Sequence, residues 1–208
     1  MSQGTSSDAP AGGPALDEEE KARADLYALL GRLFYGPPDA ALLRAIVGGG
    51  EIGAEVANAP LALAWRDLGH ACAASSEDAA RVEYDSGFIG TGKAEISLYL
   101  GAYSGRGAAD RLLLDLKEFL AARGLARRES AKEPEDHVAA VCEVMRHLIA
   151  GERASVADQK AFFNTYLWSG ATALCDAIVD SPKTDLYKPV ARFARSFLEL
   201  ERTAFDLG

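Results

Sequence analysis

Apolar residues at helical spacing, separated by helix starts and breakers, constrain the fold of this chain more than any other feature. The pattern is clearest in residues 138–149, where Val138, Val141, Met145 and Leu148 share one helix face. No two alternating segments joined by a hairpin dipeptide occur in the sequence. The sequence therefore predicts an all-α fold, a single-domain bundle of about nine helices.

The positions of these helices follow from residues that start and stop them. Acidic first turns and Ser-x-x-Asp capping boxes mark starts, whereas Gly and Pro mark ends. The capping boxes are Ser75–Asp78 and Ser155–Asp158, and Gly170 is expected to break or kink the helical run after the second. Residues 90–107 form the one long irregular segment. The expected helical ranges are 17–35, 39–47, 60–74, 75–88, 111–120, 134–149, 155–179 and one that begins after residue 182.

The length of the chain fits one domain with a short tail. With 208 residues it can bury a sizeable core. The N-terminal stretch is rich in Gly, Ser, Ala and Pro, and it lacks the basic start and apolar centre of a signal peptide. We therefore expect a flexible tail at residues 1–16 and an all-helical domain at residues 17–208.

Charge and cysteine content restrict the partners and the compartment. The formal net charge is −9, and an acidic protein repels phosphate backbones, so we expect no nucleic acid partner. No apolar run reaches the roughly 18 residues of a membrane span, so stable membrane insertion is not expected. The three cysteines, Cys72, Cys142 and Cys175, are far apart and are predicted as small core residues in a reducing compartment. The expected location is cytoplasmic.

Sequence motifs for catalysis or cofactor binding are missing. The chain has no GxGxxG after a strand, no Walker lysine loop and no HExxH. Asp67 with His70, and Glu143 with His147, place an acid and a histidine on one helix face, but a di-metal bundle needs two Glu-x-x-His helices. We therefore expect no catalytic residue, metal or cofactor. A helical metal or cofactor enzyme remains an alternative that metal analysis would test.

The stretch Glu133-Pro134-Glu135-Asp136-His137 is the strongest candidate for a binding site. Pro134 fits the first position of a helix, and the next two acids fit its first turn, where carboxylates gain about 0.3–1 kcal/mol each. This much describes an ordinary helix start. His137 sets it apart, because the positive helix end favours its neutral form while acidic neighbours favour the charged form. With Asp136 it would make a donor–acceptor pair at the helix mouth.

This stretch also carries a resemblance to a known family. Glu133-Pro134-x-Asp136-His137 at a helix opening is similar to the signature of the TorD/DmsD/NarJ family, cytoplasmic chaperones that mature molybdenum-containing redox enzymes. Residues 27–39 resemble the opening helix of that family. The order and spacing of the shared motifs extend from Tyr27 to the aromatic stretch at 162–168.

Two further motifs support the resemblance, each with a departure. In Glu83–Phe88, Tyr84 and Phe88 match the family's aromatic-x-x-Leu-Phe motif, but Gly87 replaces the Leu. Ser97-Leu98-Tyr99 resembles the Ser-x-Tyr of the family's long loop, without the prolines that usually precede it.

The resemblance implies an all-helical chaperone. It would bind the twin-arginine signal peptide, the body, or both, of an apo molybdopterin-containing oxidoreductase, and would assist cofactor insertion before export. Long helices and their connections fit a monomer or a homodimer, including one formed by domain exchange.

A twin-arginine peptide presents two guanidinium groups and an apolar segment. Guanidinium groups pair with carboxylates in bidentate geometry, which the acids of residues 133–137 could supply, with Glu83 and Asp85 as second candidates. The apolar segment would need a groove lined by aromatic residues. The residues expected to bind the peptide are Glu133, Pro134, Glu135, Asp136, His137, Tyr84, Phe88, Tyr99 and Ser97. The alternative is a generic helical adaptor or regulatory domain that binds a partner's amphipathic helix and is indifferent to arginine.

Overall fold

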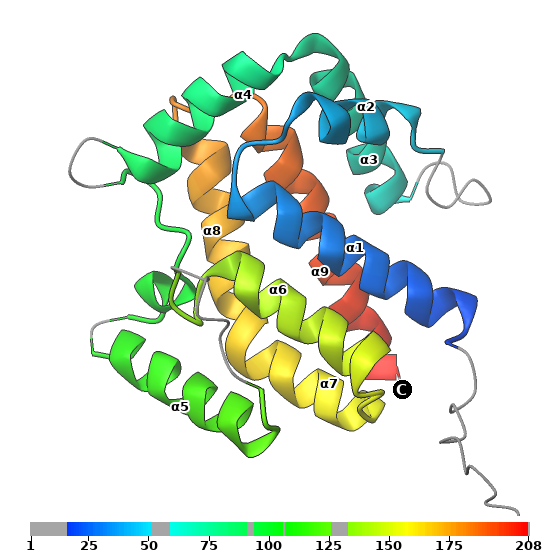
Figure 1. The fold of residues 1–208 in the computed structure, drawn as a ribbon, viewed down its shortest axis with the longest axis vertical. Coiled ribbons are helices and arrows are strands. Elements are labelled where there is room, and N and C mark those ends of the chain that lie inside the picture. The colour runs from blue at the N-terminus through cyan, green and yellow to red at the C-terminus, as the bar shows by residue number, and fades with distance from the viewer. Residues whose placement is uncertain (1–15, 51–58, 91–93, 106, 126–132, 208) are drawn as a thin grey trace, which may run out of the picture.

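The computed structural model describes residues 16–50, 59–90, 94–105, 107–125 and 133–207, and most of these residues lie in helices (Figure 1). The prediction of an all-α fold is confirmed. In the described ranges the only β pairing is an isolated bridge between Tyr99 and His137. Residues 1–15, most of the predicted tail, lie outside the description. The helices are α1 Glu18–Tyr35, α2 Ala40–Gly48, α3 Pro60–Ala74, α4 Glu77–Tyr84, α5 Ala109–Ala122, α6 Val138–Arg146, α7 Val156–Phe162, α8 Trp168–Asp180 and α9 Tyr187–Leu207.

Short irregular helical turns extend or connect some of these elements. π-helical turns at Asp85–Ile89 and His147–Gly151 continue α4 and α6, and a third at Phe163–Leu167 joins α7 to α8. Leu100–Tyr103 forms a 3₁₀ turn within the segment predicted as irregular.

Two predicted helix starts are capped by side chains, and Ser155 is the cap that the sequence predicted. The side chain of Asp17 accepts a hydrogen bond from the Glu20 N–H at 2.7 Å, and the Glu20 carboxylate accepts one from the Asp17 N–H at 3.3 Å. Ser155 caps α7 by accepting from the Asp158 N–H at 3.1 Å. Such caps satisfy N–H groups that have no partner within the helix.

Three predicted boundaries are wrong. Ser76, not Ser75, caps α4, because its hydroxyl accepts from the Ala79 N–H at 3.2 Å. The helix expected from Pro134 begins at Val138, for a reason described with the site below. Gly170 lies inside the continuous helix α8, and a Cβ there would lie 2.9 Å from the Leu100 Cβ. This glycine therefore allows the 3₁₀ turn to approach α8 closely and does not break the helix.

The long helices pack around one core. α1 packs along α6, and α9 packs against α3 and α8, so elements from both ends of the chain meet in the centre (Figure 1). α2 packs against α3, and α5 lies at one edge of the molecule (Figure 1). The core contains residues from both halves of the sequence. Its packing fixes the position of α1 relative to α6.

A buried polar cluster ties α1 to α7 and α9. Arg23 donates to both carboxylate oxygens of Glu201, at 2.6 and 2.9 Å, and to Gln159 at 3.0 Å. The Tyr27 hydroxyl also donates to Glu201 at 2.9 Å. Because Glu201 is buried and fully paired, its charge is compensated, as a buried carboxylate requires.

The cysteines behave as the sequence predicts. All three are free and buried, and burial raises the pKa of Cys72 to about 11 and of Cys142 and Cys175 to about 12. They are therefore protonated core residues at neutral pH. Within the described residues, no helix combines the length and apolar character that crossing a membrane would require.

Candidate functional site

The Glu133–His137 stretch is a turn that pairs with the Leu98–Leu100 segment. The His137 N–H donates to the Pro134 carbonyl at 3.1 Å, which closes the turn. The Leu100 N–H donates to the Asp136 carbonyl, and the Val138 N–H donates to the Leu98 carbonyl, each at 2.9 Å. This tertiary pairing holds residues 134–136 outside the helix and delays the start of α6 to Val138.

Asp136 points into the protein. Its side chain accepts from the Gly101 N–H at 3.2 Å, and only 7% of the residue is exposed. A Cβ at residue 101 would lie 2.8 Å from the Asp136 carboxylate, so only glycine leaves room for this contact. Burial raises the pKa of Asp136, against the opposing effect of the backbone hydrogen bonds. The carboxylate predicted to meet a guanidinium instead fixes the turn on the 3₁₀ segment.

His137 caps α6 with its ring. Its Nδ1 accepts from the Ala139 N–H at 3.2 Å, so in the neutral ring the proton is on Nε2. The ring is 3% exposed and makes edge contacts with Tyr99 and Tyr35, at centroid distances of 5.5 and 6.5 Å. Burial lowers the pKa of His137, and the charge of Glu133 only partly opposes this. The expected donor–acceptor pair between Asp136 and His137 is therefore not formed. Asp136 binds the Gly101 N–H, and His137 binds the Ala139 N–H of α6.

Glu133, Tyr99 and Ser97 form a connected group at the surface. The Tyr99 hydroxyl donates to the Glu133 carboxylate, and this hydrogen bond, with burial, raises the pKa of Tyr99 to about 12. Ser97 accepts from the Tyr99 N–H at 3.2 Å. These three predicted site residues are thus brought together, and Glu133 is held in position by a phenol that stays protonated at neutral pH.

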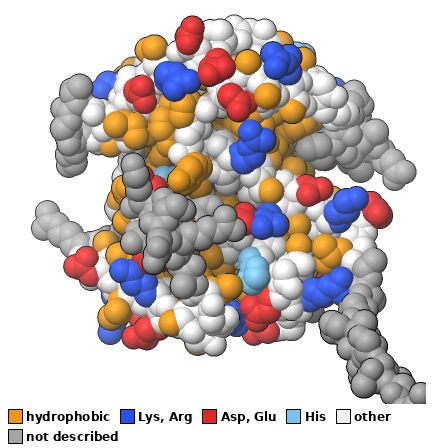
Figure 2. Space-filling view, viewed as in Figure 1, with side chains coloured by type: hydrophobic (Ala, Val, Ile, Leu, Met, Phe, Trp, Pro, Cys, Tyr) orange, Lys and Arg blue, Asp and Glu red, His pale blue; other side chains and the backbone are white. Residues whose placement is uncertain are grey.

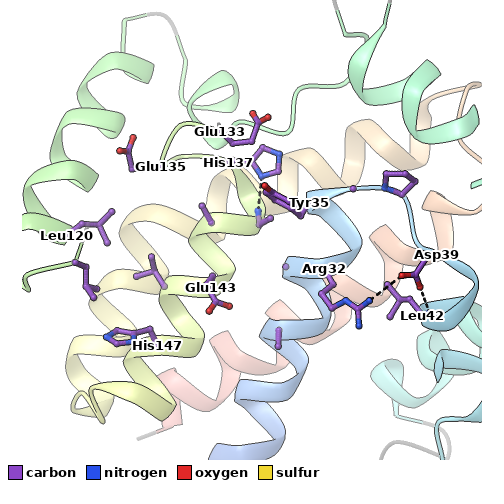
Figure 3. Close-up of a pocket in the computed structure, with 18 residues that line it drawn as sticks. Arg32, Tyr35, Asp39, Leu42, Leu120, Glu133, Glu135, His137, Glu143 and His147 are labelled. Atoms are coloured by element: carbon purple, nitrogen blue, oxygen red, sulfur yellow. Dashed lines mark hydrogen bonds and ion pairs between the residues drawn. The ribbon is translucent and has the colours of Figure 1, made fainter. Parts of the chain in front are cut away.

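A groove lies between α1 and α6 beside this turn, and we call it the α1–α6 groove (Figure 3). Its volume is about 730 Å³. Four small residues of α1 and α6 line it, and we call them its floor. It is also lined by apolar side chains of α2, α5 and α6 and by Leu125, which follows α5, and we call these its walls. The small residues are Ala28, Gly31, Ala139 and Ala140, the apolar wall residues are Leu42, Leu120, Leu125 and Val144, and the acids that line it are Asp39, Glu133, Glu135 and Glu143.

The charges along the groove are mostly negative. Its one lining arginine, Arg32, lies 3.9 Å from Asp39 (Figure 3). Hydrophobic side chains gather near the middle of the molecular face seen in Figure 2, with charged side chains around them. An apolar floor with acidic edges suits a ligand that is partly apolar and partly basic.

Tyr84 and Phe88 lie elsewhere, in the core. Their rings contact each other and Tyr187, with centroid distances between 4.8 and 5.8 Å. The Tyr84 hydroxyl donates to the Phe34 carbonyl at 3.1 Å. Both are buried and neither lines the α1–α6 groove. A Cβ at Gly87 would lie 3.6 Å from Thr184 Cγ2, so the position where the family has Leu faces the turn before α9.

Glu83, a second candidate for binding arginine, caps α9. Its two carboxylate oxygens accept from the N–H groups of Asp185, Leu186 and Tyr187 at 2.8, 3.0 and 2.8 Å. A carboxylate is favoured here because the helix start carries free N–H groups and partial positive charge. Asp85, the other second candidate, is exposed and does not line the groove.

Sequence reasoning missed two features of the groove. Tyr35, the last residue of α1, is 62% exposed and lines the groove beside His137 (Figure 3). The sequence did contain a hint of its role, since Tyr35 lies within residues 27–39, which resemble the family's opening helix. The small-residue floor was missed because it depends on a contact between α1 and α6, which are distant in the sequence. Gly31 and Ala139 meet at this contact, and a Cβ at Gly31 would lie 3.6 Å from the Ala139 carbonyl oxygen.

The described residues form a helical protein with an open groove beside the Glu133–His137 turn. No cluster of three or more His, Cys, Asp or Glu residues that could hold a metal occurs in the part of the chain that the structure describes. The family model described as nitrate reductase delta subunit matches residues 55–176. The chain therefore belongs to this family of molybdoenzyme maturation chaperones, which confirms the resemblance drawn from the motifs. Among curated proteins, none matches the sequence.

Proposed function

We propose that this protein is a cytoplasmic, system-specific chaperone for one molybdopterin-containing oxidoreductase. It binds the twin-arginine signal peptide of the apo-enzyme, the body of that enzyme, or both, and assists cofactor insertion before export. The observation that supports this most directly is the α1–α6 groove, whose floor is apolar and whose edge carries Glu133 and Glu135. A third acid, Glu143, also lines the groove, but its carboxylate is paired with Arg146. The family supplies the class of partner.

The guanidinium groups of the peptide bind at the end of the groove near Glu133 and Glu135. Guanidinium makes bidentate contacts to carboxylates, and these are stronger than neutral hydrogen bonds. Tyr99 holds the Glu133 carboxylate, so less side-chain entropy is lost when the ligand binds. The exposed ring of Tyr35 offers a face to a cation, and the neutral His137 adds no positive charge that would repel one.

The apolar segment of the peptide lies along the small-residue floor. Ala28, Gly31 and Ala140 leave space there, and Leu120 and Val144 provide apolar walls. Burying apolar surface contributes about 25 cal/mol per Å², so the groove gains affinity in proportion to the apolar length of the ligand. Selectivity then comes from the acids, and part of the affinity comes from the floor.

Calorimetric titration tests the proposal. The ligand is the signal peptide of a molybdoenzyme encoded near this gene, and its Arg-Arg→Lys-Lys version is the ligand control. Glu133→Gln should weaken binding at least tenfold, about 1.4 kcal/mol, while Glu118→Gln, an exposed acid of α5 outside the groove, should not. Ala140→Leu, which fills the floor, should also weaken binding.

The outcomes separate the candidate functions. Tight binding that Ala140→Leu abolishes, but that neither Lys-Lys nor Glu133→Gln changes, would favour the generic adaptor for amphipathic helices. No binding of any signal peptide would contradict the proposal.

A further inference from the structure

A lysine of α5 is already paired with an acid at the edge of the α1–α6 groove. The Lys117 Nζ lies 3.7 Å from Glu135 Oε2, and the two side chains are 51% and 17% exposed. Glu135 lines the groove, whereas Lys117 approaches it from outside. The positive charge of Lys117 also lowers the pKa of Asp136, against the larger raising effect of burial. One of the carboxylates that the groove offers to a basic ligand therefore has an internal cation beside it.

The geometry of this pair is weak. A distance of 3.7 Å exceeds the 2.7–3.2 Å of a good N–H···O hydrogen bond, so the contact is mainly electrostatic. Ion pairs at exposed sites typically contribute about 0.2–1 kcal/mol, and this pair joins an exposed ammonium to a carboxylate that is 17% exposed. A guanidinium can make two hydrogen bonds to one carboxylate, whereas an ammonium acts as a point charge.

We propose that Lys117 is an internal competitor for the arginine side chains of the ligand. An arginine of the bound peptide displaces the Lys117 ammonium from Glu135 and takes its place. A ligand lysine would have to displace the same ammonium at the same cost, and it would make only a point-charge contact in its place. Lys117 therefore lowers the affinity for arginine and lysine alike, and the preference for arginine comes from the bidentate contact that a guanidinium makes with the Glu135 carboxylate. This inference rests on the proposed function, which places a basic peptide in the groove.

Displacement of Lys117 leaves α5 in place. The helix is anchored to the core by the buried side chains of Leu116 and Leu120. Phe119 stacks near Phe162, with ring centroids 4.9 Å apart, and the guanidinium of Arg123 lies 3.8 Å from the centroid of the Phe119 ring. The exchange is thus a local event at the end of one exposed side chain, and a substitution of Lys117 should leave the fold intact.

Peptide titration at low salt gives the first test. Lys117→Met keeps the apolar stem and should tighten binding of the twin-arginine peptide about two- to fivefold, as expected from an exposed ion pair. Arg111→Met makes the same charge change at an exposed position of α5 outside the groove and should not tighten binding. The gain should disappear in Lys117→Met/Glu135→Gln, because the two residues act through one contact. The ratio of the Arg-Arg to the Lys-Lys affinity should be the same in Lys117→Met and in wild type, because both ligands must displace the same ammonium.

Some binding results would overturn the inference while leaving the proposed function standing. One such result is tight peptide binding that Lys117→Met leaves unchanged or weakens. Another is an equal gain in affinity in Arg111→Met, which would indicate a general charge effect.

A second readout does not depend on the signal peptide. The ¹³Cε resonance of Lys117 is followed by NMR during titration with acetyl-Arg-Arg-amide, and the Glu135→Gln protein gives the position for a displaced lysine. A shift toward that position supports the exchange, even where the full signal peptide does not bind and the proposed function fails. A resonance that stays in place while the signal peptide binds overturns the inference alone. If calorimetry shows that neither ligand binds and the resonance does not move, both the inference and the proposed function fail.

Discussion

The two acidic motifs that carry the family resemblance, Glu83–Phe88 and Glu133–His137, have different tasks in this structure. In the first, Glu83 accepts three backbone N–H groups at the start of α9, and Tyr84 and Phe88 are buried against Tyr187. In the second, three residues line an open groove: Glu133, Glu135 and His137. Within one chain, then, one motif holds the fold together and the other shapes the surface where a ligand can bind.

The difference lies in what surrounds each carboxylate. The N–H groups at a helix start that has no other cap donate hydrogen bonds to a nearby carboxylate, and Glu83 accepts three such bonds at the start of α9. The start of α6 is capped by His137 of its own chain instead, and Asp136 is turned inward. The two acids on either side of Pro134 are therefore left at the groove edge. The comparison predicts that substitutions in the first motif change stability and substitutions in the second change binding.

Phe88→Ala should have the largest effect, on stability. Removing a buried phenylalanine typically costs about 3–5 kcal/mol, and Phe88 contacts both Tyr84 and Tyr187. Urea denaturation followed by circular dichroism measures the loss. Ile89→Ala is the matched control, because the adjacent residue is 57% exposed and should change stability by less than about 0.5 kcal/mol. A stable Phe88→Ala protein that no longer binds the signal peptide would reverse the roles of the two motifs.

Glu83→Ala should come next. It leaves three N–H groups at the start of α9 without their acceptor, and we expect a loss of about 2 kcal/mol in the free energy of unfolding. Asp85→Ala, an exposed acid in the same motif, should be nearly neutral. The same denaturation series decides the matter. Equal stability of the two variants, with weaker peptide binding in Glu83→Ala, would show that Glu83 binds the ligand and that its capping contacts are dispensable.

The sequence predicted the helices well because their signals are local. The Asp17 and Ser155 caps, the Gly36-Pro37-Pro38 stop and the 3.6-residue periodicity can each be read within one turn. Gly170 misled the prediction because its purpose is a close approach by Leu100, about 70 residues away in the chain. Pro134 misled it because backbone pairing with Leu98–Leu100 outweighs a good local helix start.

The site was predictable only in part, for the same reason. Proximity in sequence places Glu133 and His137 together, and the resemblance adds Tyr99, which the structure brings to both. Whether an aromatic such as Tyr84 or one such as Tyr35 faces the groove depends on which side of its helix packs on the core. Lys117 could not be found in the sequence, since its contact with Glu135 joins α5 to a turn that follows it and no periodicity records such a pair.

The pH dependence of stability should report the buried ring of His137. Its folded pKa lies below the ordinary value of 6.5, so the stability it contributes is present above about pH 6.5 and is lost as the pH falls through the folded pKa. The loss cannot exceed about 1.4 kcal/mol per pH unit for one group. The raised pKa of Asp136 acts in the opposite direction at lower pH. Denaturation of wild type and His137→Asn between pH 7.5 and 5.5 isolates the histidine, because asparagine also caps helices but does not titrate there.

His70→Asn provides the control for that series, since His70 lies on α3 outside the groove. The wild type and His70→Asn proteins should lose stability together on acidification, and His137→Asn should lose less. Parallel curves for all three would mean that the ring is not held in its neutral form, and the groove would then carry a positive charge in the acidic range.

Tyr35→Leu should have the smallest effect, and it falls on binding. An exposed aromatic face contributes about 0.5–1 kcal/mol to a cation, so the affinity for the twin-arginine peptide should fall about two- to fivefold while stability stays near wild type. Tyr35→Phe keeps the ring and should bind as wild type does, because the predicted contact uses the ring face. Calorimetry with both variants separates the contribution of the Tyr35 ring to binding from that of its hydroxyl. If Tyr35→Phe weakened binding as much as Tyr35→Leu, the hydroxyl and not the ring would contact the ligand. If neither variant changed binding, the arginines would not contact the Tyr35 ring, and their recognition would depend on the carboxylates of the Glu133–His137 motif without a cation–π contact.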